Sequence, residues 1–262
     1  MVVWGKVVMF EHNSSENGLP RYKLLQAGDT ALAIEFGDTI DRRLSAWVLA
    51  LARRLEEARL GGIMETVPTF RSLLVYYDPL VLPVTSLVAH IEHVMRGLQI
   101  NEQPGRAWSL PVCYDASVAP DLHEVAQRTG LSPAQVIARH SGQTYHVYML
   151  GFLPGQGYMG DVPIELALPR RDIPRTQVPA GSLAIAATMT CIFPLETPCG
   201  WHVIGRSPIA LWERKPHPRA ILAPGDKVTF APVSLREYEK LRAKAAAGEL
   251  RTLRETPVGV AA

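Results

Sequence analysis

The sequence has no apolar run that approaches the ~20 residues that a membrane-spanning helix requires. It also has little net charge, +2 from 27 basic and 25 acidic residues. This balance argues against nucleic acid or an anionic membrane as a partner, because both attract strongly basic surfaces. Only three cysteines occur in 262 residues. An odd number argues against a disulfide framework, so we expect the protein in a reducing cytoplasm.

Familiar nucleotide motifs are missing or incomplete. No Gly-Lys-Ser/Thr occurs, which argues against a phosphate-binding P-loop. Residues Gly155–Gly160 fit the Gly-x-Gly-x-x-Gly spacing of dinucleotide sites, but Pro154 precedes them and Pro163 follows closely. A helix cannot begin well there, so its N-terminus cannot meet a pyrophosphate. We expect instead a tight loop that presents Tyr158.

Metal and serine-hydrolase chemistry are also poorly supported. Cys191, Cys199 and His202, with His140 or His146, have the chemistry of zinc ligands, but their spacing matches no common zinc pattern. Small buried core cysteines are the better interpretation, and we expect no metal. The sequence around Ser207 is not a Gly-x-Ser-x-Gly elbow, which argues against a Ser/His/Asp triad.

What is present is a globular composition, 47% hydrophobic and 20% charged, sufficient for a substantial core. We expect an α+β protein in which a small N-terminal α/β sandwich domain precedes a β-barrel or sandwich. The expected segments are an irregular leader over 1–21, the α/β domain over 22–103, the barrel over 104–232, and a helix with a tail over 233–262.

In the N-terminal half, short apolar runs alternate with helical periodicity. Residues 24–36 read as one or two strands, broken at Gly28. An apolar face at helical spacing predicts a helix capped by Asp41 and ended by the glycines at 61 and 62. Further elements predicted in this half are strands over 63–67 and 73–77 and a helix over 86–98. Strands followed twice by helices are typical of a two-layer domain.

The C-terminal half predicts shorter strands. A strand over 108–114 and helices over 121–128 and 132–139 come first. From Tyr145 onward, apolar segments recur between turn residues, a pattern typical of a barrel or sandwich. The predicted strands are 147–152, 182–188, 202–204, 209–212 and 227–231. Ser234 and Glu237 fit a capping box that opens a helix to about residue 247.

Arginines next to prolines and glycines are the strongest functional signal. Arg170, Arg171 and Arg175 lie in a proline-bounded stretch, and Arg206 follows Gly205. The planar fork of arginine suits a carboxylate or phosphate. The alternative is that these arginines are solvated or brace the fold. The acidic residues considered for that bracing are Asp161, Asp172 and Glu196.

Several motifs in matching order resemble one family. In the N-terminal half they are Ala27-Gly-Asp-Thr-Ala-Leu, Pro68-Thr-Phe-Arg-Ser-Leu-Leu-Val and Tyr77-Asp-Pro. In the C-terminal half they are Tyr148-Met-Leu-Gly-Phe-Leu-Pro-Gly, Pro169-Arg-Arg with Ile173-Pro-Arg, Val178-Pro-Ala-Gly-Ser, Gly200-Trp-His-Val-Ile-Gly-Arg-Ser-Pro and Pro224-Gly-Asp. Over residues 21–232 the chain thus resembles the family of allophanate hydrolase subunit 1, also described as the B subunit of 5-oxoprolinase and as the KipI-type kinase inhibitor.

The resemblance implies a cyclophilin-like β-barrel as the second domain. It implies a homologous second barrel subunit as partner, known as the C subunit or subunit 2, and a third partner, the A subunit. The implied reaction is ATP-dependent hydrolysis of the small anionic lactam 5-oxoproline. ATP would then be bound by, or shared with, the partner subunits. Two alternatives stay open: a KipI-type protein that inhibits a histidine kinase, and a carboxyltransferase-like enzyme recruited to another small substrate.

The resemblance also suggests roles for particular residues. Arg175 and Arg206 are candidates for anion binding or transition-state stabilisation, and His140 and His202 for proton transfer. The candidates for the substrate-binding pocket are Tyr158, Arg170, Met189 and Trp201.

The chain departs from the family's usual pattern at the expected pocket. The usual Pro-Gly-Phe-Pro-Tyr is Pro154-Gly-Gln-Gly-Tyr158 here, and the usual Gln-Thr-Gly-Ile-Tyr-Pro is Met189-Thr-Cys-Ile-Phe-Pro194. The usual Pro-Gly-Gly-Trp is Pro198-Cys-Gly-Trp201. These changes alter side chains that would face a substrate. They therefore favour a pocket that differs from that of the family, on a barrel that is the same.

Overall fold

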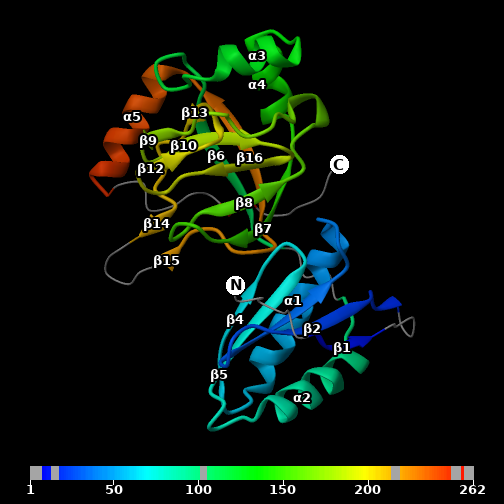
Figure 1. The fold of residues 1–262 in the computed structure, drawn as a ribbon. Coiled ribbons are helices and arrows are strands. Elements are labelled where there is room, and N and C mark those ends of the chain that lie inside the picture. The colour runs from blue at the N-terminus through cyan, green and yellow to red at the C-terminus, as the bar shows by residue number, and fades with distance from the viewer. Residues whose placement is uncertain (1–7, 13–17, 101–104, 214–218, 249–254, 257–262) are drawn as a thin grey trace. The chain divides into compact units, whose positions relative to one another are not determined.

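The computed structural model describes residues 8–12, 18–100, 105–213, 219–248 and 255–256, and the chain divides into two compact units, 1–103 and 104–262 (Figure 1). The first unit contains a five-stranded antiparallel sheet in the order β1-β2-β3-β5-β4. Its strands are β1 (Val8–His12), β2 (Tyr22–Gln26), β3 (Ala31–Phe36), β4 (Ile63–Pro68) and β5 (Ser72–Tyr77). Its helices are α1 (Arg42–Ala58) and α2 (Val84–Arg96).

The core of this unit forms between the sheet and the two helices. Alternate residues of β3, such as Leu32 and Ile34, are fully buried together with Val48 and Leu51 of α1 and Ile91 of α2. This is the packing that period-2 and period-3.6 apolar patterns predict. The α/β expectation for this unit is therefore confirmed.

Two local expectations were wrong. Part of the segment expected to be an irregular leader is the strand β1, which pairs with β2. Helix α1 ends before the expected glycines, because Arg59 takes up the left-handed conformation (φ 46°) and donates its N–H to Glu56 O. Gly62, with φ 98°, is used instead in the turn that leads into β4.

The second unit is a closed barrel. Seven strands follow one another in the order β13-β10-β11-β8-β7-β16-β6, and β13 pairs again with β6 to complete the circle. Their bounds are β6 (Ala107–Cys113), β7 (Tyr145–Leu150), β8 (Gly157–Gly160), β10 (Ser182–Ala186), β11 (Met189–Ile192), β13 (His202–Arg206) and β16 (Lys227–Val233). The overall α+β class with a barrel is thus confirmed.

Shorter elements surround the barrel. They are the helices α3 (Leu122–Thr129), α4 (Pro133–Ser141), η2 (Ile164–Leu166) and α5 (Leu235–Ala246), and the strands β9 (Arg175–Val178), β12 (Thr197–Cys199), β14 (Trp212–Glu213), β15 (Arg219–Ala220) and β17 (Glu255–Thr256). Strands β9 and β12 form a two-stranded sheet, as do β14 and β15. The expected strand over 209–212 was wrong, because only Trp212 of that range lies in a strand.

Barrel closure depends on a missing side chain at Gly205. A Cβ atom there would lie 2.9 Å from Val112 Cγ1 and 3.0 Å from Cys113 O of β6. The first distance is too short for a real Cβ contact and the second is tight, so a side chain at position 205 would force β6 or β13 to shift. The two strands meet immediately beyond it, where Arg206 pairs with Cys113.

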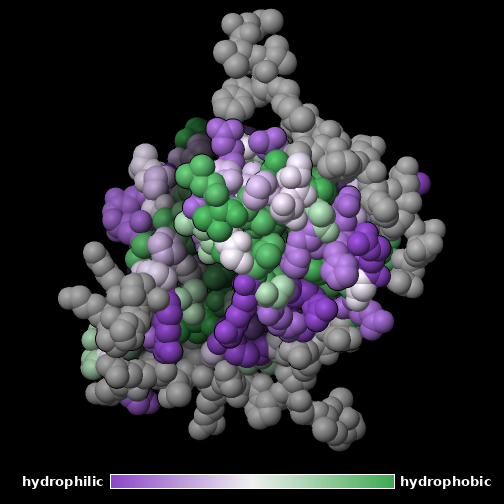
Figure 2. Space-filling view, turned by 90° about the horizontal axis from the view of Figure 1, so that it is seen from below, coloured by the Kyte–Doolittle hydropathy of each residue, from purple (hydrophilic) through white to green (hydrophobic). Residues whose placement is uncertain are grey.

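Some large apolar side chains remain exposed in both units. They are Ile40, Met64, Tyr76, Leu80, Val81, Phe152, Ile164, Ile173 and Leu195. Figure 2 shows apolar side chains gathered near the centre of the face it presents, with polar side chains around them. Within the barrel, Phe152 lies in the loop that precedes Tyr158, and Ile173 lies between the candidate arginines.

The cap of α1 offers a first test of the fold. Asp41 Oδ1 accepts the N–H groups of Arg43 (2.7 Å) and Leu44 (3.3 Å), which have no acceptor within the helix. Replacing Asp41 by alanine should therefore lower the stability of α1 by about 1 kcal/mol. Hydrogen exchange of the α1 amides measures the loss. The exposed Asp38 is the control, and an equal effect of Asp38→Ala would contradict the capping role.

Candidate functional site

Residues 169–175, here called the strap, are tied to the chain that leads into β13. His202 Nε2 lies 3.0 Å from Pro169 O, and because a carbonyl only accepts, this nitrogen carries the proton and donates it. The N–H of Arg171 donates to Gly200 O at 2.8 Å. The position of the strap's arginines is therefore set by backbone contacts as well as by their side chains.

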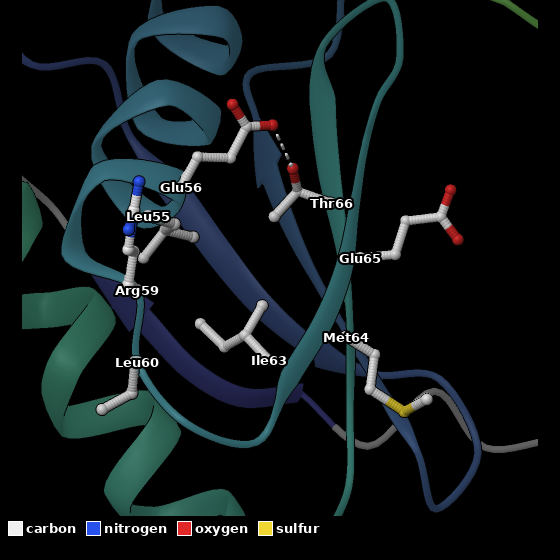
Figure 3. A pocket seen from close by; sticks show the side chains of 8 residues that line it. All are labelled: Leu55, Glu56, Arg59, Leu60, Ile63, Met64, Glu65 and Thr66. Atoms are coloured by element: carbon white, nitrogen blue, oxygen red, sulfur yellow. Dashed lines mark hydrogen bonds between the residues drawn. The ribbon is translucent and has the colours of Figure 1, made fainter.

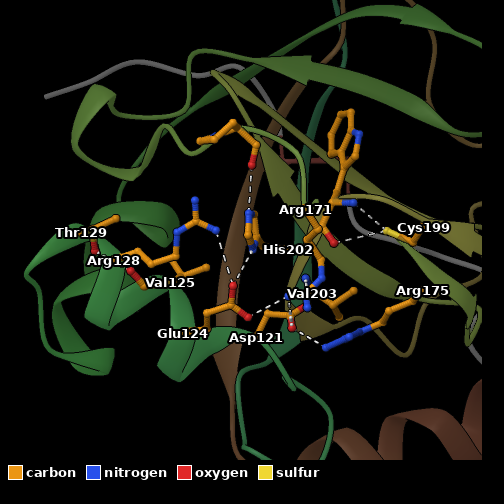
Figure 4. Close-up of polar contacts among 12 residues, drawn as sticks. Asp121, Glu124, Val125, Arg128, Thr129, Arg171, Arg175, Cys199, His202 and Val203 are labelled. Carbon is orange, nitrogen blue, oxygen red and sulfur yellow. Dashed lines mark hydrogen bonds and ion pairs between the residues drawn. The ribbon is translucent and has the colours of Figure 1, made fainter. Parts of the chain in front are cut away.

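The centre of the site is the buried carboxylate of Asp121, which precedes α3 (Figure 4). Its Oδ1 accepts from Arg171 Nη1 at 2.8 Å and from Arg175 Nη2. Its Oδ2 accepts the N–H of Val203 at 2.7 Å, while the N–H of Asp121 itself donates to Val203 O at 3.0 Å. One side chain that is only 1% exposed thus joins α3, the strap and β13.

A second carboxylate, Glu124 of α3, extends the network. It accepts from Arg171 Nη1 at 2.8 Å, and this hydrogen bond is the main reason why the pKa of Glu124 is lowered. His202 Nδ1 lies 3.9 Å from Glu124 Oε1. This Nδ1 atom is buried and has no hydrogen-bond partner.

The network changes the interpretation of two predicted residues. Arg175 was expected to bind an anionic substrate, but its guanidinium is paired with Asp121. His202 was expected to transfer protons, but it is fully buried and holds the strap. Sequence reasoning missed Asp121 and Glu124 as the acidic partners. The only signal for them was their place at the start of a predicted helix, which does not reveal a contact with residues some fifty positions away.

An aromatic surface lies beside this network. The rings of Tyr158 and Trp201 meet edge to face with centroids 5.9 Å apart, and we call this pair the aromatic shelf. The guanidinium of the exposed Arg170 lies 6.0 Å from the centre of the Trp201 ring. Burial is the main cause that raises the pKa of Tyr158, so its hydroxyl stays protonated at neutral pH. The structure therefore brings together three of the four predicted substrate-binding residues.

Two further predicted residues lie at different distances from the shelf. Met189 begins β11 opposite Gly160 of β8, so it faces the same side of the sheet as Tyr158, two residues along β8. Arg206 ends β13, and its Nε donates to Ala180 O at 3.0 Å. This contact directs Arg206 toward the turn between β9 and β10 rather than toward the shelf.

His140 is a core residue. Its Nδ1 lies 3.0 Å from Tyr114 Oη and its Nε2 3.1 Å from Thr190 Oγ1, and the ring stacks on Phe230. Since Thr190 donates its own proton to Ala184 O, His140 Nε2 must donate to Thr190 and Nδ1 must accept from Tyr114. Burial lowers the pKa of His140 to about 3. These contacts support a structural role for a residue that was predicted to be catalytic.

A separate pocket of about 340 Å³ lies in the first unit, between α1 and β4 (Figure 3). Leu55, Leu60 and Ile63 line its apolar part, and Glu56 accepts a hydrogen bond from Thr66 at its rim. It holds no histidine or cysteine, and its charged side chains, Glu56, Arg59 and Glu65, are exposed. The chemistry of the chain is concentrated at the strap and the shelf, which we therefore take as the candidate site.

Two searches of the described residues bear on other classes of function. Among residues 18–100, 105–213 and 219–248, no group of three or more histidine, cysteine or acidic side chains is placed to hold a metal ion. All three cysteines are free and buried. Within the same part of the chain, no helix has the length and apolar character needed to cross a bilayer.

The sequence matches a known family of carboxyltransferase domains. Residues 22–222 match the family described as carboxyltransferase domain, subdomain C and D. The chain is 37% identical over 232 residues to the B subunit of 5-oxoprolinase from Bacillus subtilis (strain 168), covering 83% of this chain and 95% of that one. It is 34% identical over 217 residues to the B subunit of 5-oxoprolinase from Escherichia coli O157:H7, covering 82% and 97%.

Two solved structures have a similar fold. TTHA0988 superposes with a TM-score of 0.70 at 35% identity, over 78% of this chain and 40% of that longer chain. The K. lactis urea amidolyase superposes with a TM-score of 0.77 over 92% of this chain and 16% of that one, at 20% identity, a likeness of fold. The α/β unit and closed barrel thus define the carboxyltransferase class of architecture. The chain belongs to the carboxyltransferase domain family, subdomains C and D.

Removing the central carboxylate tests the network. In Asp121→Ala, Arg171 and Arg175 lose their shared partner and the Val203 N–H loses its acceptor. We expect the barrel to lose about 2–3 kcal/mol, less than for a fully buried pair because both arginines are partly exposed. Hydrogen exchange of the β10 and β13 amides measures this. Glu196→Ala, an exposed carboxylate, is the control, and a loss no larger than in that variant would refute the central role of Asp121.

The protonation of His140 provides a pH test. The unfolded chain binds this proton near pH 6.5, whereas folded His140 stays neutral to about pH 3. Between these values the unfolded state binds more protons, so His140 makes the free energy of unfolding fall as the pH falls. Nitrogen NMR should show a neutral ring protonated at Nε2 from pH 8 to pH 5. In His140→Gln, the free energy of unfolding should depend less steeply on pH over this range. Protonation of the ring within that range would contradict the buried hydrogen-bond chain.

Proposed function

We propose that this protein is the B subunit of a 5-oxoprolinase-type complex, which opens a small cyclic amide that carries a carboxylate. The observation that carries the proposal is the 37% identity to the Bacillus subtilis relative over 95% of that chain. In this assignment the partners are two further subunits in the cytoplasm, one of which is a homologous barrel. A kinase-inhibitor role and a different carboxyltransferase-like reaction stay predictions from the sequence.

The aromatic shelf supports a substrate of this shape. A five-membered ring that carries a carboxylate presents a flat, weakly polar body and a single anionic group. The partly exposed Tyr158 offers a ring surface to the body and packs against Trp201, which is 8% exposed. Arg170 offers a charged fork that is not held in the Asp121 network. A charge-assisted hydrogen bond from arginine to a carboxylate gives orientation as well as affinity.

The Asp121 network has a different task in this proposal. Arg171 and Arg175 both pair with Asp121, and Arg171 and Arg128 both pair with Glu124. Because these guanidinium groups are already paired, the network holds the strap in place and leaves anion binding to Arg170. Pro169 and Arg171, on either side of Arg170, contact His202 and Gly200, on either side of Trp201. These contacts position Arg170 and Trp201 relative to each other.

The described part of this chain shows no glycine-rich loop that would bind the phosphates of ATP. Gly157–Gly160 form β8 and are followed by the non-helical residues 161–163, so the glycine motif does not lead into a helix N-terminus. We therefore assign ATP binding to the partner subunits. The residues of this chain bind and orient the cyclic amide, and the buried His140 and His202 take no part in proton transfer.

Arg170 provides the direct test. In the chain combined with its partner subunits and ATP, we expect release of glutamate from 5-oxoproline. Arg170→Ala should raise the KM for 5-oxoproline by about 10- to 100-fold, because a charge-assisted contact is lost. The exposed Arg236 on α5 is the matched control, and Arg236→Ala should leave the KM unchanged. An unchanged KM in Arg170→Ala would exclude this site assignment, and the absence of glutamate release would exclude the function.

A further inference from the structure

The side chain of Gln156 is buried without a complete set of hydrogen bonds. It is 1% exposed, and its Oε1 has no partner. An unpaired buried amide oxygen costs roughly 1–3 kcal/mol of stability. An apolar side chain of similar size would avoid that cost, so Gln156 needs an explanation other than stability.

The direction of the neighbouring residues places Gln156 on the side of the aromatic shelf. A Cβ atom on Gly157 would meet Leu222 Cδ1 at 3.2 Å and Val147 Cγ1 at 3.4 Å, both in the barrel core. Gln156 immediately precedes β8, and its carbonyl continues the β7–β8 ladder by accepting the N–H of Gly151 at 3.1 Å. Side chains alternate along such a ladder, so residues 156 and 158 face the opposite side from Gly157. Gln156 and Tyr158 therefore share one face, and Tyr158 is half of the shelf.

The loop that ends at Gln156 is tight and strained. The N–H of Gly151 donates to Gln156 O at 3.1 Å, and the N–H of Leu153 donates to Gly151 O at 2.8 Å. The second bond encloses Phe152 in a three-residue turn with φ 67°, a conformation that costs of order 1–3 kcal/mol for a residue other than glycine. The Phe152 ring is 67% exposed, so packing does not compensate for that strain.

A carboxamide matches one edge of a cyclic amide. In a small ring the amide is held cis, so its N–H and C=O point to the same side. A glutamine side chain presents one acceptor, Oε1, and one donor group, Nε2, on its own edge. The two edges form a pair of parallel hydrogen bonds, which satisfies the acceptor that Gln156 now leaves unpaired.

We propose that Gln156 is a specificity-determining residue that recognises the N–H and C=O edge of a cyclic amide whose ring lies on the aromatic shelf. This proposal rests on the proposed function, since it names the part of the substrate that the site recognises. Because Gln156 is 1% exposed, the proposal requires that the strained loop carrying Phe152 moves to admit the ligand.

The test uses the full chain and three small ring compounds. The probes are 5-oxoproline, its lactone analogue with a ring oxygen in place of N–H, and succinimide, a cyclic imide that keeps an N–H and C=O edge but has no carboxylate. Binding is measured by calorimetry or by ligand-observed NMR. The wild-type chain should bind 5-oxoproline about 10-fold or more tightly than the lactone, because the lactone leaves Oε1 unpaired. Equal affinities would overturn the proposal without any variant.

Gln156→Met is the matched variant, similar in size but without the amide. It should lose the preference for 5-oxoproline over the lactone, whereas its unliganded thermal midpoint should equal or exceed that of the wild type. A folded Gln156→Met variant that keeps the preference would overturn the proposal. A merely structural glutamine would instead lower the midpoint and weaken both ligands equally, which also overturns it.

The two proposals fail in different ways. If succinimide binds in a Gln156-dependent manner and 5-oxoproline does not bind, the named substrate is wrong and the recognition of a cyclic amide stands. If glutamate release from 5-oxoproline proceeds with the same KM in Gln156→Met, the proposed function stands and the role of Gln156 is refuted. If no cyclic amide binds to the wild-type chain, the role of Gln156 is refuted.

Discussion

The carboxylate of Asp121 is the contact on which the candidate site depends. It accepts hydrogen bonds from Arg171, Arg175 and the backbone N–H of Val203, so it fixes the strap to the start of α3 and to β13. A buried carboxylate is costly to desolvate unless such donors surround it. The donors come from segments that are distant in sequence, and for this reason the site forms only when the barrel has closed.

The elements that follow from local pattern were predictable. The caps at Asp41, Ser132 and Ser234 all accept hydrogen bonds at helix starts, and the apolar alternation of β3 matches its burial. The short strands β8, β9, β11 and β12 were missed, because segments of three or four residues next to glycine or proline carry too little periodicity to recognise. Barrel closure at Gly205 likewise depends on a contact with β6 that no local pattern contains.

The site was predictable in part. Arg170, Tyr158 and Trp201 were singled out from the sequence and do lie together. The sequence could not separate an arginine that is free to bind a ligand from one that is already paired, because the pairing of Arg175 requires the position of Asp121. The same limit applies to His140, which has the chemistry of a catalytic residue but sits in a satisfied core.

The candidate site divides into a network of paired charges around Asp121 and an adjacent shelf. The Asp121 network supplies rigidity, and the shelf supplies the guanidinium of Arg170 beside Trp201 and the unpaired amide oxygen of Gln156. Substitutions on the shelf can therefore change the ligand without changing the barrel. Strain at Phe152, next to that surface, is consistent with a loop that changes position when a ligand binds.

The location of the ligand is the central claim, and intermolecular NOEs test it most directly. With 5-oxoproline added to the full chain, the account predicts contacts from the ligand ring protons to the aromatic protons of Tyr158 and Trp201. Contacts to the methyl groups of Leu55 and Ile63 would place the ligand in the pocket between α1 and β4 instead. That result would contradict the assignment of the site to the barrel.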